Sequence, residues 1–369
     1  MSNLEEHLNK GKHLYEELND IFRKYPNINE LGLIVSTKEY EQNKEDVKSN
    51  SKSFVVVDTN LGVTYQSVTP LYHYCFKTLN QLMEQHSLKI IDDIFFRNLD
   101  PIIVQSVLNL TRTLLMINAE NLTSLNLRKR FIQNGMLSHE MEIKFLNLVF
   151  TKHPKSGEAW CHRRWVLTDS PCWSALNLES EIAVCRRVAE IYPKNYYAWC
   201  HRMWCLNTQL SMANLLADLK RMDQWALRNV SDYCGFHHRF ELLRQVYRLA
   251  AEGRCDWQSV IDLWSREFYM IDSLIKKYPG HETLWSHKRM CTTSWLVDII
   301  GNDSSRNHLQ QCQLVNAQLQ LPTMEQQLFY CKSIHDDKES SYYTEQSTFA
   351  IRYSYWIIQR DIFIEHHTK

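Results

Sequence analysis

Apolar residues recur every three or four positions in several stretches of this chain, which is the period of an amphipathic α-helix. Three of these stretches are followed, directly or after one residue, by a proline: Glu140–Lys152, Glu181–Tyr192 and Arg266–Tyr278. A proline disfavours helical geometry in the residue before it, so each helix is expected to end there. A short polar turn follows, and a tryptophan then opens a second helix. The pattern predicts units of helix, turn and helix.

These units are copies of one repeat. The two clearest copies run from Pro154 to Trp165 and from Pro193 to Trp204, and both contain Trp-Cys-His-Arg. The tryptophan position recurs at intervals of 35 to 49 residues and is filled by Leu125, Trp160, Trp199, Phe236 and Trp285. A single hairpin cannot bury its apolar face, whereas stacked hairpins share a continuous core. The expected fold class is therefore all-α, a right-handed α–α solenoid.

Four parts are expected along the chain. They are a diverged N-terminal region (1–105), five hairpin repeats (106–300), a polar loop or partly ordered insertion (301–345) and a closing helix (346–369). Within the first part the patterns predict a helix, a polar surface loop, an extended segment and a second helix that starts at Thr69-Pro70: Leu4–Tyr25, Thr37–Ser53, Phe54–Val63 and Thr69–His86. The closing helix is expected over Thr348–Glu365.

Composition narrows the class of protein further. Only 9 Gly and 8 Pro occur, which favours helices over turn-rich β folds. Lys plus Arg and Asp plus Glu each number 42, so the basic excess of a nucleic-acid-binding protein is absent. The N-terminus lacks a signal-peptide pattern, and no window is apolar enough to span a membrane. Since the 11 cysteines form no Cys-x-x-Cys pair, reduced thiols in a cytoplasmic protein are expected.

The turns before the tryptophans carry the candidate chemistry. Lys155 and Lys194 occupy the same position in successive repeats, and Tyr196 and Tyr197 follow the second lysine. Two ammonium groups beside a phenol could bind a diphosphate, although a solvated surface explains the same residues. The repeated Trp and Arg are interpreted as packing residues, with the Arg bonding free helix-end carbonyls.

No metal site is expected in the chain. His281-Glu282 begins like a zinc-protease motif, but Trp285 stands where the second His should be. The chain also lacks a Gly-rich phosphate loop and a nucleophile elbow. Taken alone, it has no recognisable catalytic machinery.

The repeat resembles that of the α subunits of protein prenyltransferases. The segment from Pro154 to Trp165 is similar to the second repeat of the Rab geranylgeranyltransferase type, and Lys194 to Arg202 is similar to the third repeat of the farnesyltransferase type. The resemblance covers about residues 110–295. The diverged N-terminal region and the Leu125 and Phe236 variants place the chain nearest to a member outside the three standard subunits.

The resemblance implies an α subunit, a crescent of hairpins that wraps around a β subunit. The β subunit, of the Rab geranylgeranyltransferase type by this resemblance, would hold the zinc ion and the isoprenoid pocket. The implied co-substrate is geranylgeranyl diphosphate, and the implied acceptor is a protein with C-terminal cysteines, such as a SNARE that already carries a farnesyl group. A recognisable Rab-type accessory module is missing, which argues against Rab proteins as acceptors.

The resemblance also assigns roles to residues. Lys155 occupies the position of the family's diphosphate-stabilising lysine, and Tyr196 and Lys194 would assist catalysis. The diphosphate-binding set is Lys155, Lys194, Asn195, Tyr196 and Tyr197. Two positions depart from the family: Gly157 replaces a Tyr, and Tyr197 replaces the His of the farnesyl type. The competing hypothesis is a non-catalytic scaffold that presents a helical-repeat surface to a protein partner.

Overall fold

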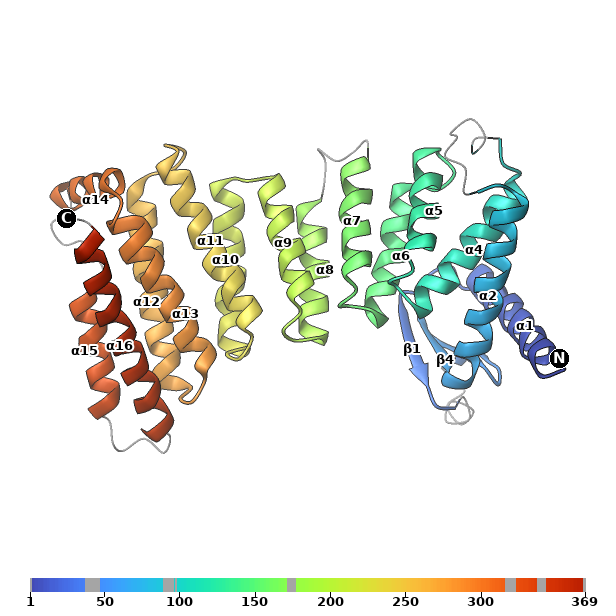
Figure 1. Cartoon of the computed structure of the whole chain (residues 1–369), viewed down its shortest axis with the longest axis horizontal. Helices are drawn as coiled ribbons and strands as arrows, with labels where there is room; N and C mark the ends of the chain where they lie inside the picture. Colours follow the sequence, from blue (N-terminus) through green and yellow to red (C-terminus); the bar gives the residue numbers. More distant parts are fainter. Residues whose placement is uncertain are drawn as a thin grey trace. The chain divides into compact units, whose positions relative to one another are not determined.

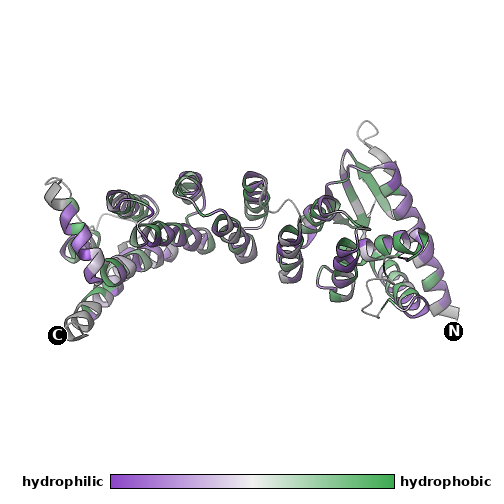
Figure 2. Ribbon diagram, turned by 90° about the horizontal axis from the view of Figure 1, so that it is seen from above, coloured by the Kyte–Doolittle hydropathy of each residue, from purple (hydrophilic) through white to green (hydrophobic). Residues whose placement is uncertain are grey.

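Paired helices make up most of the computed structural model (Figure 1). The structure describes residues 2–36, 47–88, 96, 98–170, 177–315, 323–336 and 343–367. The chain divides into two compact units, Met1–His201 and Arg202–Lys369. Hydrophobic and hydrophilic positions fall on different faces of the helices (Figure 2), as a stack of hairpins around shared cores requires.

The first unit begins with a helix and a small sheet. Helix α1 (Ser2–Lys24) precedes four strands and helix α2 (Tyr65–Gln85); the strands are β1 (Glu30–Ile34), β2 (Val47–Asn50), β3 (Phe54–Val57) and β4 (Asn60–Thr64). The order in the sheet is β1-β4-β3-β2, with β1 parallel to β4 and the other pairs antiparallel. Asp58, with φ of 53°, lies in the turn that joins β3 to β4.

The sheet packs on the first two long helices. Alternate buried residues of β3 and β4, such as Val56 and Leu61, join the cluster that includes Leu18 of α1 and Leu71 of α2. Gly11 lets α1 and α2 approach closely, since a Cβ there would lie 2.3 Å from the Pro70 carbonyl oxygen. The result is a mixed α/β layer that precedes the repeats.

Five helical hairpins follow. Their helices are α4 (Pro101–Ile117) and α5 (Leu122–Gln133), α6 (His139–Lys152) and α7 (Gly157–Asp169), α8 (Leu178–Ile191) and α9 (Tyr196–Thr208), α10 (Met212–Arg228) and α11 (Tyr233–Ala251), and α12 (Trp257–Lys277) and α13 (Glu282–Thr293). The Leu31 amide of β1 donates to Thr151 Oγ1 of α6 over 3.0 Å, which ties the sheet to these hairpins.

The second unit ends in a π-helical segment and three helices. These are η3 (Ser294–Ile300), α14 (Asp303–Val315), α15 (Met324–Asp336) and α16 (Tyr343–His367). Of the two alternatives expected for 301–345, a polar loop does not describe α14 and α15, which are helical, and a partly ordered insertion stays a prediction. Gln327 of α15 is buried, as are Tyr330 and Ile334 of the same helix.

The predicted helical-repeat class is confirmed, with the sheet as an addition. The helix over Leu4–Tyr25, the closing helix and the extended character of 54–63 are confirmed by α1, α16, β3 and β4. Two details are wrong. Helix α2 begins at Tyr65 rather than Thr69, with Pro70 inside it, and strand β2 occupies part of the expected loop Thr37–Ser53. Residues 37–46 of that loop lie outside the described residues.

Among the described residues, no helix is both long and apolar enough to cross a lipid bilayer.

Candidate functional site

The two lysine-bearing turns are fastened to each other through one carbonyl group. The Pro154 oxygen accepts hydrogen bonds from Trp160 Nε1 at 2.9 Å and from Asn195 Nδ2 at 2.7 Å. Asn195 Oδ1 also accepts from the Ala198 amide at 3.2 Å, which caps helix α9. Because Lys155 follows Pro154 and Lys194 precedes Asn195, these bonds hold the two lysine-bearing turns side by side.

The predicted polar groups around these turns are exposed, with one exception. Lys155 and Lys194 are exposed, as are Tyr196 (63%) and Tyr197 (39%), whose rings stand nearly perpendicular with centroids 5.7 Å apart. Asn195 is the exception. Its side chain is fully buried and both ends of its amide are bonded within the fold, so the prediction that Asn195 binds diphosphate directly is corrected to a role in holding the turns together.

Lys194 has an unusual backbone conformation. Its φ is 61°, in the left-handed region, and the residue at the same position of the last repeat is Gly280, with φ of 83°. A side chain in this region costs about 1 kcal/mol relative to glycine. Lys194 thus has a backbone conformation that glycine adopts more easily.

Tyr197 lies against Gly157 of the preceding repeat. A Cβ at Gly157 would lie 3.2 Å from Tyr197 Cε1 and 3.4 Å from its hydroxyl oxygen. The absent side chain at 157 therefore leaves the space that the Tyr197 ring occupies. The two departures from the family pattern noted in the sequence are thus one coupled feature, in which a phenol from position 197 reaches position 157.

Tyr196 remains a hydrogen-bond donor at neutral pH. A hydrogen bond with Cys200, one turn further along α9, raises the pKa of Tyr196, and the positive charge of Arg164 only partly opposes that shift. A protonated, exposed phenol can donate to a phosphate oxygen.

Beneath the turns, buried ionic layers connect each hairpin to the next. In every layer a carboxylate from the first helix of a hairpin accepts from an Arg of the preceding hairpin and from a His of its own second helix. The layers are Arg128–Glu142–His162, Arg163–Glu181–His201, Arg202–Asp218–His238 and Arg239–Glu267–His287. The carboxylate always precedes the His by 20 residues. We call this series the ionic ladder.

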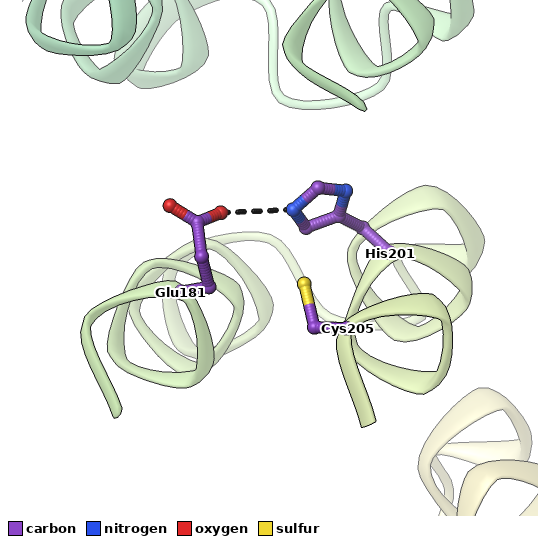
Figure 3. Close-up of side chains that lie close together, drawn as sticks. All are labelled: Glu181, His201 and Cys205. Atoms are coloured by element: carbon purple, nitrogen blue, oxygen red, sulfur yellow. Dashed lines mark hydrogen bonds and ion pairs between the residues drawn. The ribbon is translucent and has the colours of Figure 1, made fainter. Parts of the chain in front are cut away.

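The layer around Glu181 shows how the ladder is stabilised. Arg163 donates to the two carboxylate oxygens of Glu181 over 2.8 and 2.7 Å. His201 Nε2 lies 2.9 Å from Glu181 Oε2 (Figure 3). Burial alone would raise the pKa of Glu181, but Arg163 and His201 outweigh it and lower the pKa to about 2. Burial lowers the pKa of His201 to about 4, so the imidazole is neutral at pH 7.

The second ring nitrogen of two ladder histidines has no partner. Nδ1 of His162 and of His287 is buried without a hydrogen-bond partner. A donor N–H at that position would be unsatisfied, which is costly, whereas a bare lone pair is tolerated more easily. In both residues the Nε2 hydrogen therefore points to the ladder carboxylate.

The ladder ends at Lys288, which stands where the other repeats have Arg. Its ammonium group bonds Asp272 of the same hairpin and lies 4.2 Å from the Tyr330 ring centre of α15. Burial lowers the pKa of Lys288, and Asp272 counteracts that shift. The terminal cation is thus used to attach the final helices.

In the described part of the chain, two buried groups have the residue types of a metal site but the wrong chemistry: Glu181–His201–Cys205 (Figure 3), whose carboxylate is bonded by Arg163, and Glu267–His287–Cys291. Glu267, His287 and Cys291 lie close together, with Cys291 Sγ 3.5 Å from His287 Nε2. Glu267 is already bonded by Arg239, and burial raises the pKa of the Cys291 thiol well above its usual value. The position four residues after each ladder His is occupied by apolar side chains or cysteines: Val166, Cys205 (Figure 3), Leu242 and Cys291. The shared apolar character identifies a packing position. These sets do not fit a zinc ion.

Comparison with known proteins agrees with the repeat geometry. The family model described as protein prenyltransferase alpha subunit repeat matches residues 139–169, 178–209, 215–246 and 264–295. Four segments of the chain are thus similar to the prenyltransferase alpha subunit repeat. Each match covers most of one helical hairpin, from α6–α7 to α12–α13. The hairpin α4–α5 lies outside the matches, yet its Arg128 contributes to the ionic ladder like the Arg of a matched repeat.

Individual relatives match over most of the chain. A protein prenyltransferase alpha subunit repeat-containing protein 1 from Danio rerio is 29% identical over 325 residues, which cover 76% of this chain and 71% of the relative. The human protein of that name is 27% identical over 322 residues, covering 74% of this chain and 75% of its own. One from Xenopus laevis, named 1-B, is 28% identical and covers 74% and 70%.

Proposed function

We propose that this chain is the α subunit of a heterodimeric protein geranylgeranyltransferase. The enzyme would transfer a geranylgeranyl group from its diphosphate to a cysteine thiol of a protein. The observation that carries the proposal is the pair of fastened turns, which expose Lys155 and Lys194 beside Tyr196 and Tyr197. The four segments similar to the prenyltransferase alpha subunit repeat support it.

The chemistry requires a site that accepts negative charge. The cysteine sulfur attacks C1 of the prenyl chain, the C1–O bond breaks, and diphosphate leaves with the bonding electron pair. Donors aimed at the oxygens where this charge develops lower the barrier. Lys155 and Lys194 would provide positive charge, and the Tyr196 hydroxyl would donate a hydrogen bond. Tyr197, placed by the space at Gly157, would provide a second phenol.

The remaining parts of the enzyme would come from a partner. A zinc ion on the β subunit would lower the pKa of the acceptor thiol and so supply the thiolate. The β subunit, which we expect to be of the Rab geranylgeranyltransferase type, would also hold the isoprenoid chain. The acceptor would be a protein with C-terminal cysteines, for which a farnesylated SNARE is the first candidate.

A non-catalytic scaffold is the second candidate function. It is favoured by the ionic ladder, because the buried carboxylates and histidines of the described residues serve the fold and leave no catalytic group of their own. In this alternative the exposed phenols and lysines would be only a surface that contacts a protein partner.

Co-expression with the β subunit separates the two candidates. The chain and a Rab-type β subunit are purified together, and transfer of labelled geranylgeranyl to a panel of proteins with C-terminal cysteines is measured. The proposal expects a complex with one copy of each subunit that transfers the label. A stable complex that transfers no label to any member of the panel would favour the scaffold, and failure to form a complex would refute the subunit assignment.

A further inference from the structure

The last two helices form a hairpin, one side of which is attached to the final repeat. Trp285 Nε1 of α13 donates to Gln346 Oε1 over 3.0 Å, and the ring of Trp285 lies 5.8 Å from that of Tyr353 of α16. Tyr353 joins Ile357 in the cluster that packs on α12 and α13. Helices α15 and α16 therefore continue the stack of the second unit by one more hairpin.

The other side of this hairpin contains an apolar groove. The groove has a volume of about 400 Å³ and runs between α15 and α16, where it is lined by Leu328, Ile351, Tyr355 and Ile358. Three of these side chains are well exposed: Tyr355 at 66%, Ile358 at 46% and Ile351 at 40%. Terminal hairpins of repeat proteins usually present a polar outer face, so this surface is unusually apolar for an end.

The shape of the groove suits a helix. The backbone groups of α15 and α16 are bonded within each helix, so an added β-strand would find no partners for its own backbone. An amphipathic helix can instead place side chains at positions i, i+3 or i+4 and i+7 between two parallel rows of side chains. The 13 residues of α15 span about 20 Å, room for such contacts over about three turns.

Charge decides between the possible occupants. The lining contains one charged side chain, the ammonium group of Lys332, and no acidic residue. A second copy of this chain that used the same surface would bring like charges together, which disfavours a symmetric dimer. A helix with acidic residues beside its apolar face would complement the groove.

We propose that the groove between α15 and α16 binds an acidic amphipathic helix of a partner protein. Leucine-like side chains of the helix would fill the space beside Tyr355 and Ile358, and its carboxylates would pair with Lys332. This role is separate from the proposed diphosphate site and does not depend on prenyl transfer.

Two designed peptides test the proposal on the full-length chain. Both are fluorescent 16-residue helices with leucine on one face; one has glutamate beside that face and the other has lysine. Fluorescence anisotropy should show saturable binding of the glutamate peptide and at least tenfold weaker binding of the lysine peptide. Tyr355→Ala should weaken binding of the glutamate peptide about tenfold, because the substitution removes a large exposed aromatic side chain from the groove.

Matched variants distinguish binding in the groove from non-specific binding of the peptides. Tyr269→Ala removes a tyrosine that is 79% exposed on α12 and should leave binding unchanged. Lys332→Glu should weaken binding of the glutamate peptide about fivefold and should strengthen binding of the lysine peptide. Since all three side chains are exposed, unchanged urea midpoints are expected and serve as the folding check.

Equal affinity for both peptides, no saturable binding, or equal effects of Tyr355→Ala and Tyr269→Ala would overturn the proposal. Light scattering that shows a dimer abolished by Tyr355→Ala would assign the groove to a second copy and would overturn it as well.

Discussion

Replacement of one ladder carboxylate should destabilise the protein far more than replacement of a surface carboxylate on the same helix. Glu181→Gln keeps the size of the side chain and removes its charge. In the structure Glu181 is 4% exposed and holds Arg163, which is 1% exposed, and His201, which is fully buried. The substitution leaves a buried guanidinium without its counter-charge.

The magnitude follows from the contacts. Breaking a buried ion pair by removing one partner costs about 3–5 kcal/mol. The glutamine oxygen can still accept one bond, and Arg163 keeps its bond to Asn147 Oδ1 at 2.9 Å, so we expect the lower end, about 3 kcal/mol. The control Glu190→Gln breaks an exposed pair with Arg186, with N and O 3.8 Å apart, and should cost less than about 0.5 kcal/mol.

Urea unfolding followed by tryptophan fluorescence and by circular dichroism measures both free energies. A third variant tests the cause: Arg163→Met, Glu181→Leu and His201→Leu together replace the whole layer by apolar groups, and should recover most of the loss. Equal effects of Glu181→Gln and Glu190→Gln, or a triple variant that is less stable than Glu181→Gln, would refute the account of the ladder.

Three further predictions concern the turns and the ladder. Lys194→Gly should raise the free energy of unfolding by about 0.5–1 kcal/mol in urea titrations, because glycine suits a φ of 61°; a loss would contradict the strain at this position. Gly157→Ala should change the free energy of unfolding more favourably, by at least about 0.5 kcal/mol, in a chain that also carries Tyr197→Ala than in the unaltered chain. A double-mutant cycle measures this difference, and additive effects would mean that the two residues are not coupled. Since burial lowers the pKa of His201 from 6.5 to about 4, the unfolded chain binds an extra proton below pH 6.5, and stability should fall as the pH drops from 7 to 5; urea midpoints that rise over this range would argue against a neutral buried His201.

The hairpins could be predicted from the sequence because their signals are local. A proline that stops one helix lies six residues before the tryptophan of the next helix, and the periodic stretches on either side are long. Pro154 and Trp160 even bond each other, so the pattern that identifies the repeat is also a contact. The positions of Lys155 and Lys194 in neighbouring turns followed from the same register.

The sheet could be predicted only in part. The β-branched run at 54–57 indicated an extended segment, but the parallel pairing of β1 with β4 joins residues about 30 positions apart. Such pairing depends on the packing of α1 and α2 over the sheet, which no local pattern reveals. Helices α14 and α15 could not be predicted for a related reason, since their sequences are polar and their apolar positions do not form a clear local pattern.

The main partner of the repeated Arg differs from the one that the sequence pattern favours. The repeated Arg was expected to bond free carbonyls, and Arg163 does contact the Ile143 oxygen at 3.4 Å, but its main partner is Glu181. In the sequence, a Glu or Asp lies 20 residues before the His of each His-Arg or His-Lys pair. This spacing predicts the remaining layers once the first layer is known.

The most direct test of the central claim is the single-turnover rate of prenyl transfer by the complex with the β subunit. We predict that Lys155→Ala lowers this rate by about tenfold to a hundredfold while the complex still assembles, because one donor to the departing diphosphate is lost. Lys144→Ala, at an exposed site on α6, should transfer at the unaltered rate. An intact complex in which Lys155→Ala transfers as fast as Lys144→Ala would contradict the assignment of these turns as the diphosphate site.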